Sequence, residues 1–209
     1  MAGGYIQVPP DSTGKKLNAR YRAIEGGAGY EQYVALHGMP TFYCLAPSVN
    51  LAQNKHLFSL YNDAGSGYLI RIPRLSIVNM SLTTLTGVGV ELDFIRTTSQ
   101  SGGTTITPQK ADTADADLAA GIHIATGATI AEGALMWPVT LNNDEIPLTL
   151  NAVPLLDFNM IPRGMDVKPL CIRPGEGFSI KQITSTVVGL WSVLAVITAE
   201  DLQPKAAKR

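Results

Sequence analysis

Charge is scarce in this sequence. Asp, Glu, Lys and Arg make up 16% of its 209 residues and nearly cancel, leaving a formal net charge of −1, whereas globular chains carry about 25% charged residues. A protein that binds nucleic acid through the phosphates shows a large basic surplus, so we expect no nucleic-acid partner. Because 45% of the residues are apolar, much surface must be buried, either in a well-packed monomer or against neighbouring subunits.

Cysteine and long apolar runs are also rare. Cys44 and Cys171 are the only cysteines, and their separation matches no zinc-ligand spacing. Both have apolar neighbours, so we expect buried free thiols, with a disulfide between them as the alternative. Met1–Pro10 lacks the features of a secretory signal, and the longest apolar stretch, Val187–Ile197, is too short to span a bilayer. These absences predict a soluble protein that is made in a cytoplasm and has no membrane partner.

Residues with catalytic chemistry are few. The three histidines, His37, His56 and His123, have no second ligand at a metal-binding offset. No nucleophile elbow, phosphate loop or dinucleotide fingerprint occurs. We therefore predict a protein that is not an enzyme, with no catalytic residue, no cofactor and no metal. A metal enzyme of the cupin type is the alternative, but it needs clustered histidines with a carboxylate, and these histidines are scattered.

One long polar connection, Thr97–Gly121, contains three acidic residues, Asp112, Asp115 and Asp117. Loops of that length in a compact domain are usually functional or interfacial. Calcium prefers several oxygen ligands, but the spacing of an EF-hand is absent, so we expect a solvated acidic loop and leave its role open. The connection has no aromatic residue, which counts against a glycan-binding loop.

Helical periodicity is nearly absent, because prolines recur throughout the second half of the chain. Instead, apolar residues alternate with polar ones, as Val90, Leu92 and Phe94 do with Glu91 and Asp93. Period two predicts a strand with one buried and one wet face. Turn signals rich in Gly, Pro and Asn separate many such segments. The pattern predicts an all-β domain over residues 31–200, an antiparallel β-sandwich or jelly roll.

The stretch Tyr68–Asn79 predicts an irregular strand. Ile70 and Ile72 share one alternation phase, whereas Leu75 and Ile77 share the opposite one. A strand that kept its register would expose one of these pairs to solvent. Because proline is tolerated at bulges, we expect one long strand bent by a bulge near Pro73.

The two ends of the chain differ from its middle. Residues 1–30 are rich in Gly, Pro and polar residues, and Gly26–Gly29 is typical of a hinge. We expect an extended N-terminal arm, either ordered against a partner or without a role, and a solvated tail over residues 201–209. The residues of the arm that we expect to contact a partner are Lys15, Lys16, Arg20, Tyr21 and Arg22.

The last predicted strand, Leu190–Thr198, is apolar on both faces. A strand of an antiparallel sandwich that is apolar on both sides needs cover on its outer face. That cover is either another part of the same chain or another subunit, and we favour a subunit. Because aromatic residues dominate interface energetics, the predicted subunit contacts are Trp191, Val193 and Ile197.

Several turn-and-strand motifs resemble small virion proteins of tailed bacteriophages. In those proteins a hairpin with a Gly-Ser-Gly turn opens a sandwich of jelly-roll type, and a Pro-Gly-Glu-Gly turn precedes a late strand. The resemblance covers about residues 50–200 and leaves the arm unmatched. The motifs that carry it are Leu57–Ile72, Phe94–Ser99 with Ser101–Thr105, and Arg173–Phe178.

This resemblance implies a capsid decoration (cement) protein, a homotrimer that binds the major capsid protein and stabilises a phage head. Its location would be the virion surface, after synthesis in the bacterial host. The alternative that the resemblance leaves open is a jelly-roll module of a tail or fibre that binds a host glycan. Proteins of this kind have no catalytic residues to carry over.

Overall fold

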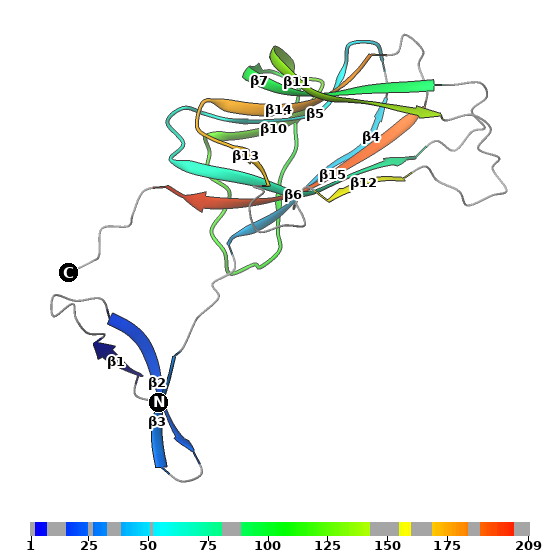
Figure 1. The fold of residues 1–209 in the computed structure, drawn as a ribbon. Helices are drawn as coiled ribbons and strands as arrows, with labels where there is room; N and C mark the ends of the chain where they lie inside the picture. The colour runs from blue at the N-terminus through cyan, green and yellow to red at the C-terminus, as the bar shows by residue number, and fades with distance from the viewer. Residues whose placement is uncertain are drawn as a thin grey trace. The chain divides into compact units, whose positions relative to one another are not determined.

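The computed structural model describes residues 3–7, 16–24, 27–32, 39–50, 52–80, 89–142, 155–159, 169–183 and 189–202. In residues 3–32 the description is limited to backbone pairing. The chain divides into two compact units, Met1–Gly38 and Met39–Arg209, and every regular element of the described residues is a β-strand (Figure 1). Within these residues there is no helix that is long and apolar enough to cross a membrane. The chain is therefore all-β, as predicted.

The first unit contains a small antiparallel sheet in the order β1-β2-β3. Its strands are β1 (Gly3–Gln7), β2 (Lys16–Ile24) and β3 (Gly27–Gln32). β2 and β3 pair as far as Ile24 opposite Gly27, so most of the predicted hinge belongs to a hairpin. The extended arm predicted over residues 1–30 is thus a sheet within a unit that ends at Gly38.

Four of the five residues predicted to form the contacts of the arm lie on the middle strand of this sheet. Lys16, Arg20, Tyr21 and Arg22 belong to β2, and Lys15 lies outside the described residues. Lys16–Ile24 has the period-two alternation of a strand, with Leu17, Ala19, Tyr21 and Ala23 on one face. Residues 1–30 are rich in glycine, and this composition, which predicts an extended arm, outweighed the alternation of β2.

The second unit is an antiparallel sandwich of two sheets (Figure 1). Sheet I has the strand order β12-β6-β15-β4-β9, with β13 also paired to β6, and sheet II has the order β11-β7-β14-β5-β10-β8. The strands are β4 (Thr41–Asn50), β5 (His56–Asn62), β6 (Tyr68–Asn79), β7 (Gly89–Ser101), β8 (Thr104–Thr105), β9 (Gln109–Lys110), β10 (Ile122–Thr126), β11 (Thr129–Asn142), β12 (Leu155–Asn159), β13 (Leu170–Ile172), β14 (Glu176–Gln182) and β15 (Leu190–Asp201). The sandwich thus begins later than the predicted residue 31 and includes Asp201, the first residue of the predicted tail.

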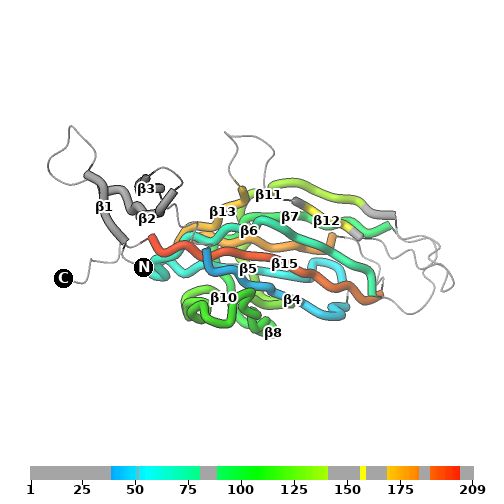
Figure 2. Tube along the Cα trace, turned by 90° about the horizontal axis from the view of Figure 1, so that it is seen from below, coloured from blue at the N-terminus to red at the C-terminus, as the bar shows by residue number. Residues whose placement is uncertain are grey.

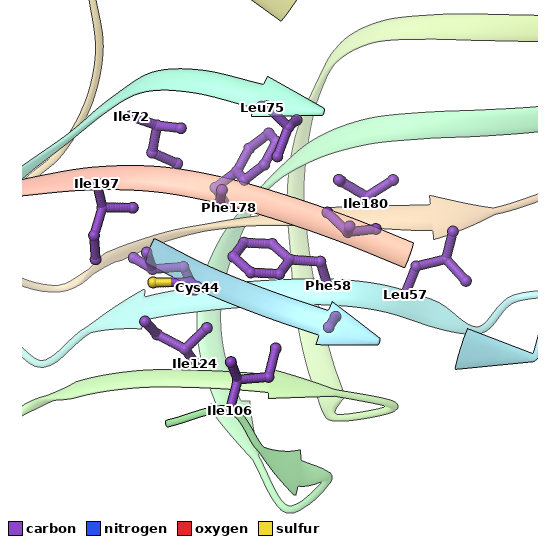
Figure 3. Packing of buried hydrophobic residues seen from close by; sticks show 14 of the residues in the cluster. Cys44, Leu57, Phe58, Ile72, Leu75, Ile106, Ile124, Phe178, Ile180 and Ile197 are labelled. Atoms are coloured by element: carbon purple, nitrogen blue, oxygen red, sulfur yellow. The ribbon is translucent and has the colours of Figure 1, made fainter. Parts of the chain in front are cut away.

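The core fills the space between the two sheets (Figure 3). Phe58, Phe178 and Ile180 of sheet II pack in one buried cluster with residues of sheet I such as Leu75 and Ile197. Burying aromatic and branched side chains of this size contributes roughly 1.5–3 kcal/mol each. This cluster holds the two sheets face to face.

Both cysteines are free. Cys44 lies in the core, and burial raises the pKa of its thiol to about 12. Cys171 on β13 is only partly buried. The prediction of free thiols is confirmed, and that of complete burial holds for Cys44 alone.

The irregularity predicted near Pro73 is present. β6 is one strand, and its pairing with β15 shifts register where Val196 faces Arg74 and Thr198 faces Arg71. Ile70, Ile72, Leu75 and Ile77 are consequently all 0% exposed. The extra residue on β6 returns the second apolar pair to the core, as expected of a bulge.

The last strand differs from the prediction in which face it buries. Trp191, Val193 and Ile197 are 0% exposed and belong to the core. These side chains have no surface left with which to contact a second subunit, so the predicted interface residues are core residues. The outer face of β15 carries the half-buried Leu194 and Val196 instead.

We predict that the two faces of β15 differ strongly in their effect on stability. Trp191→Ala should lower the free energy of unfolding by about 3–5 kcal/mol, because it leaves a cavity in the core. Leu194→Ala on the outer face of the same strand should cost no more than about 1 kcal/mol. Urea denaturation of both variants tests this, and equal losses would contradict the assignment of the two faces.

Candidate functional site

A polar cluster lies on the outer face of sheet II. Ser179 and Lys181 alternate with the core residues Phe178 and Ile180 along β14. His56, on the neighbouring strand β5, is the residue that pairs with Lys181. His56 Nδ1 lies 2.8 Å from Ser179 Oγ, and its Nε2 lies 3.7 Å from Glu132 Oε1 on β11. Lys181 Nζ is 2.7 Å from the same carboxylate oxygen.

The cluster has the residue types of a serine hydrolase, but the hydroxyl of its serine is buried and already hydrogen-bonded. The Ser179 hydroxyl donates to the Phe58 carbonyl oxygen at 3.0 Å, so His56 Nδ1 carries the hydrogen of the bond between them. Ser179 is 0% exposed, and a substrate has no access to its oxygen. Sequence reasoning missed the cluster because His56 and Ser179 are 123 positions apart. It serves as a satisfied set of polar groups beside the core.

Burial sets the protonation of His56. It lowers the pKa of the ring below its usual value, and the positive charge of Lys181 acts in the same direction, while Glu132 opposes both. The folded protein therefore holds His56 in its neutral form more strongly than the unfolded chain does.

A second feature is a cavity of about 610 Å³ that is lined mainly by residues 102–128, the segment between β7 and β11, which we call the insertion. β8 and β10 of the insertion extend sheet II, whereas β9 pairs with β4 of sheet I. Figure 2 shows the insertion next to β4. Thr97–Ser101, the first part of the predicted long connection Thr97–Gly121, belongs to β7. The rest of that connection lies in the insertion, which joins both sheets at one edge.

Lys110 contacts two of the three aspartates of the insertion, Asp115 and Asp117. Lys110 Nζ lies 3.1 Å from Asp117 Oδ1 and donates to the carbonyl oxygen of Asp115 at 2.9 Å. Asp112 accepts a hydrogen bond from the backbone of Ala114. Among the residues from 39 onward that the structure describes, no group of three or more His, Cys, Asp or Glu side chains could hold a metal ion.

The third feature is an apolar strip on the outer face of sheet I, formed by Tyr43, Leu45, Leu194 and Val196. Leu194 pairs with Leu45, and Val196 pairs with Tyr43, so the side chains of each pair lie side by side on one face. Tyr43 and Leu45 are 45% and 49% exposed. Figure 2 shows β4 and β15 next to each other, with β6 on the far side of β15. Large exposed apolar groups that are adjacent indicate a contact surface.

Charged residues border the strip on the side of β6 and β12. Arg74 makes two hydrogen bonds with Asp157, at 3.0 and 2.9 Å, and Ser76 donates to the same carboxylate at 2.7 Å. The hydrogen bonds from Arg74 and Ser76 hold the pKa of Asp157 below its usual value. Arg71 pairs with Glu200 in the same sheet. These charges are matched within the chain.

Comparison of the chain with protein-family models, curated proteins and solved structures finds no match.

The neutral state of His56 predicts a pH dependence of stability. Because its pKa is lower in the folded protein than in the unfolded chain, the unfolded state binds more protons as the pH falls below about 6.5. The melting temperature should therefore decrease between pH 7.5 and 5.5, and His56→Gln should remove part of this decrease. Thermal melts at both pH values measure it. His123→Gln, which changes a half-exposed histidine, is the control, and an equal loss of pH dependence there would contradict the assignment.

Proposed function

We propose that this chain is a virion structural protein without catalytic activity, a capsid decoration subunit that stabilises a phage head. In this proposal, copies of the chain contact one another as a trimer and bind the major capsid protein on the virion surface. The apolar strip is the observation that carries the proposal. The motifs that resemble small phage virion proteins support a phage head as the particle to which the chain binds.

The order of the strands supports a sandwich of jelly-roll type. Aside from the insertion and the short β13, the eight strands of the two sheets pair from the outside of the sequence inward: first with last, second with second-last, and so on to the middle. The pairs are β4 with β15, β5 with β14, β6 with β12, and β7 with β11. One long antiparallel ribbon that is rolled up gives this nested pairing, and a jelly roll combines two Greek keys of eight strands in that way.

The strip fits a contact between copies of the same chain. Tyr43 and Leu45 are large, exposed and adjacent in one sheet, and β4 lies near the sheet edge, with only the two residues of β9 beyond it. Each buried Å² of apolar surface contributes roughly 25 cal/mol before the costs of association. Contacts of this kind are weak one by one, but they can hold an assembly together when symmetry repeats them in every copy.

The N-terminal unit supplies a second contact in this proposal. It is compact by itself, and its middle strand carries Lys16, Arg20 and Arg22. Because β2 contains no acidic residue, it is a local concentration of positive charge, which Glu31 of β3, opposite Arg20, offsets in part. An acidic surface of the major capsid protein would complement it.

A substitution in the strip tests the contact between copies. Light scattering on the full chain should give the mass of a trimer, and Leu45→Asp should give a monomer with an unchanged fold, because a buried unpaired carboxylate is costly. Leu135→Asp is the matched control, since Leu135 is 54% exposed on sheet II, and it should remain a trimer. A wild-type monomer at high concentration, or equal dissociation of both variants, would refute the proposed interface.

A charge substitution tests the contact with the capsid. Purified protein should sediment with undecorated heads of its phage, and the variant with Lys16, Arg20 and Arg22 changed to Ser should bind at least about tenfold more weakly, since each lost charge pair at an interface contributes to binding. The control changes Lys205, Lys208 and Arg209 to Ser, which removes the same charge from the other end of the chain. Failure of the wild type to bind heads would reject the proposed role.

A further inference from the structure

The sheet of the first unit has one apolar face. Successive residues of a strand lie on alternate faces, and residues directly opposite each other in an antiparallel pair lie on the same face. The register therefore places Tyr21 of β2 beside Tyr30 of β3. It places Leu17 of β2 beside Ile6 of β1 on the same face. No charged residue of the three strands occupies a position on this face, which we call the N-terminal apolar face.

The opposite face of the same sheet carries its charge. Lys16, Arg20 and Arg22 alternate with the apolar positions of β2, and Glu31 of β3 lies opposite Arg20. These four are the charged residues of β1, β2 and β3. Apolar and charged positions are thus completely separated, as in a sheet with one buried and one solvated face.

The N-terminal apolar face needs a second layer. A sheet that is hydrophobic on one face must bury that face against another element. Within residues 3–32 as the structure describes them, every regular element belongs to this one sheet. None of these strands forms a layer over the apolar face, so the layer comes from another part of the molecule or from another molecule.

A trimer brings the apolar strip of sheet I against a different surface of the next copy. A two-fold dimer pairs a patch with itself, whereas copies in a closed three-membered ring contact one another through two unlike patches. Away from the three-fold axis, the strip of one copy therefore does not meet the strip of the next. The strip also consists of only four residues, whereas a stable interface has about 20–30 residues on each side. The proposed trimer thus requires a second apolar surface on the same chain.

The N-terminal apolar face complements the strip in its chemistry. Both surfaces are parts of sheets, and both combine tyrosine with aliphatic residues. The arginines that border the strip are already paired within the chain, as Arg74 is with Asp157. A face without charge matches such a surface, whereas the basic face of the N-terminal sheet would bury charges there without partners. Two sheets that pack face to face, about 10 Å apart, are a common way to bury surfaces of this kind.

We infer that the N-terminal apolar face of one copy packs against the apolar strip of the next copy, so that each copy covers sheet I of its neighbour. This inference rests on the proposed function and names the partner of the strip within it. Residues 33–40 join the N-terminal sheet to β4, and a chain of this length spans at most about 26–29 Å, which is enough to cross to an adjacent copy. Packing by the apolar face leaves Lys16, Arg20 and Arg22 on the other side of the sheet, where they face the major capsid protein.

Cross-linking between two differently tagged full-length copies tests this contact. One copy carries Leu45→Cys in the strip, and the other carries Leu17→Cys or Tyr21→Cys in the N-terminal apolar face. Both copies carry Cys171→Ser, and both keep Cys44, because burial raises the pKa of its thiol to about 12 and shields it from reagents. After co-expression and treatment with a short bis-maleimide, we expect a linked product that contains both tags.

The matched control is Arg20→Cys, which lies next to Tyr21 in the sequence but on the opposite face of the sheet. It should give severalfold less of the product with both tags. A trimeric protein that gives no such product from Leu17→Cys or Tyr21→Cys, or as much of it from Arg20→Cys, would overturn the inference. A link formed only within one chain that carries both Tyr21→Cys and Leu45→Cys would overturn it as well. Each of these results leaves the proposed trimer and its capsid role standing.

A new charge on either face of the N-terminal sheet gives an independent measurement. Tyr21→Asp should convert the trimer to a monomer in light scattering, as expected of Leu45→Asp, because it would bury an unpaired carboxylate. Asn18→Asp adds the same charge to the basic face and should remain a trimer. If Leu45→Asp dissociates the trimer and Tyr21→Asp does not, the strip has another partner and the inference is wrong, while the proposed function stands. A wild-type monomer would refute both.

Discussion

The burial of one face of β15 is the interaction on which the rest of the sandwich depends. This strand is hydrogen-bonded to β4 on one side and β6 on the other, and Trp191, Val193 and Ile197 fill the core beneath it. The last strand of the sandwich thus pairs with the first, so the domain is complete only when distant parts of the chain have met. Because the inner face of β15 is fixed in this way, Leu194 and Val196 are left outside, next to Leu45 and Tyr43. The apolar strip is a direct consequence of how the core is closed.

Local patterns in the sequence were sufficient for strands with clear alternation, such as β7, and for the bulge in β6. The alternation of Ile70 and Ile72 changes phase before Leu75 and Ile77, and only an extra residue can bury both pairs. The same reasoning was insufficient for β15, where both faces are apolar within Leu190–Thr198. The signal lies just beyond that stretch. Ala199 continues the inner face, whereas Thr198 and Glu200 continue the outer one, so the phase of Trp191 is the one that stays apolar as far as Ala199.

The polar sites could not be predicted, because they are assembled by pairing between distant segments. His56 and Ser179 meet only through the register of β5 with β14. Asp63 and His123 meet because the turn after β5 is bonded to the start of β10. No spacing in the sequence encodes either meeting. The N-terminal sheet was missed for a different reason, since glycines have no side chain with which to mark the alternation of β1 and β3.

The charges beside the strip determine what kind of association it can support. Arg74 is already matched by Asp157, and Arg71 by Glu200, so neither arginine brings an unpaired charge to a partner. Attraction at this face must then come from apolar contact and complementary shape. Salt screens only interactions between charges, and ion pairs already formed within the chain add little to binding, so this attraction depends little on ionic strength. The N-terminal unit, with its basic strand, is the part of the chain that salt would affect. In the proposed assembly, contacts between copies therefore persist at ionic strengths that release the chain from its capsid.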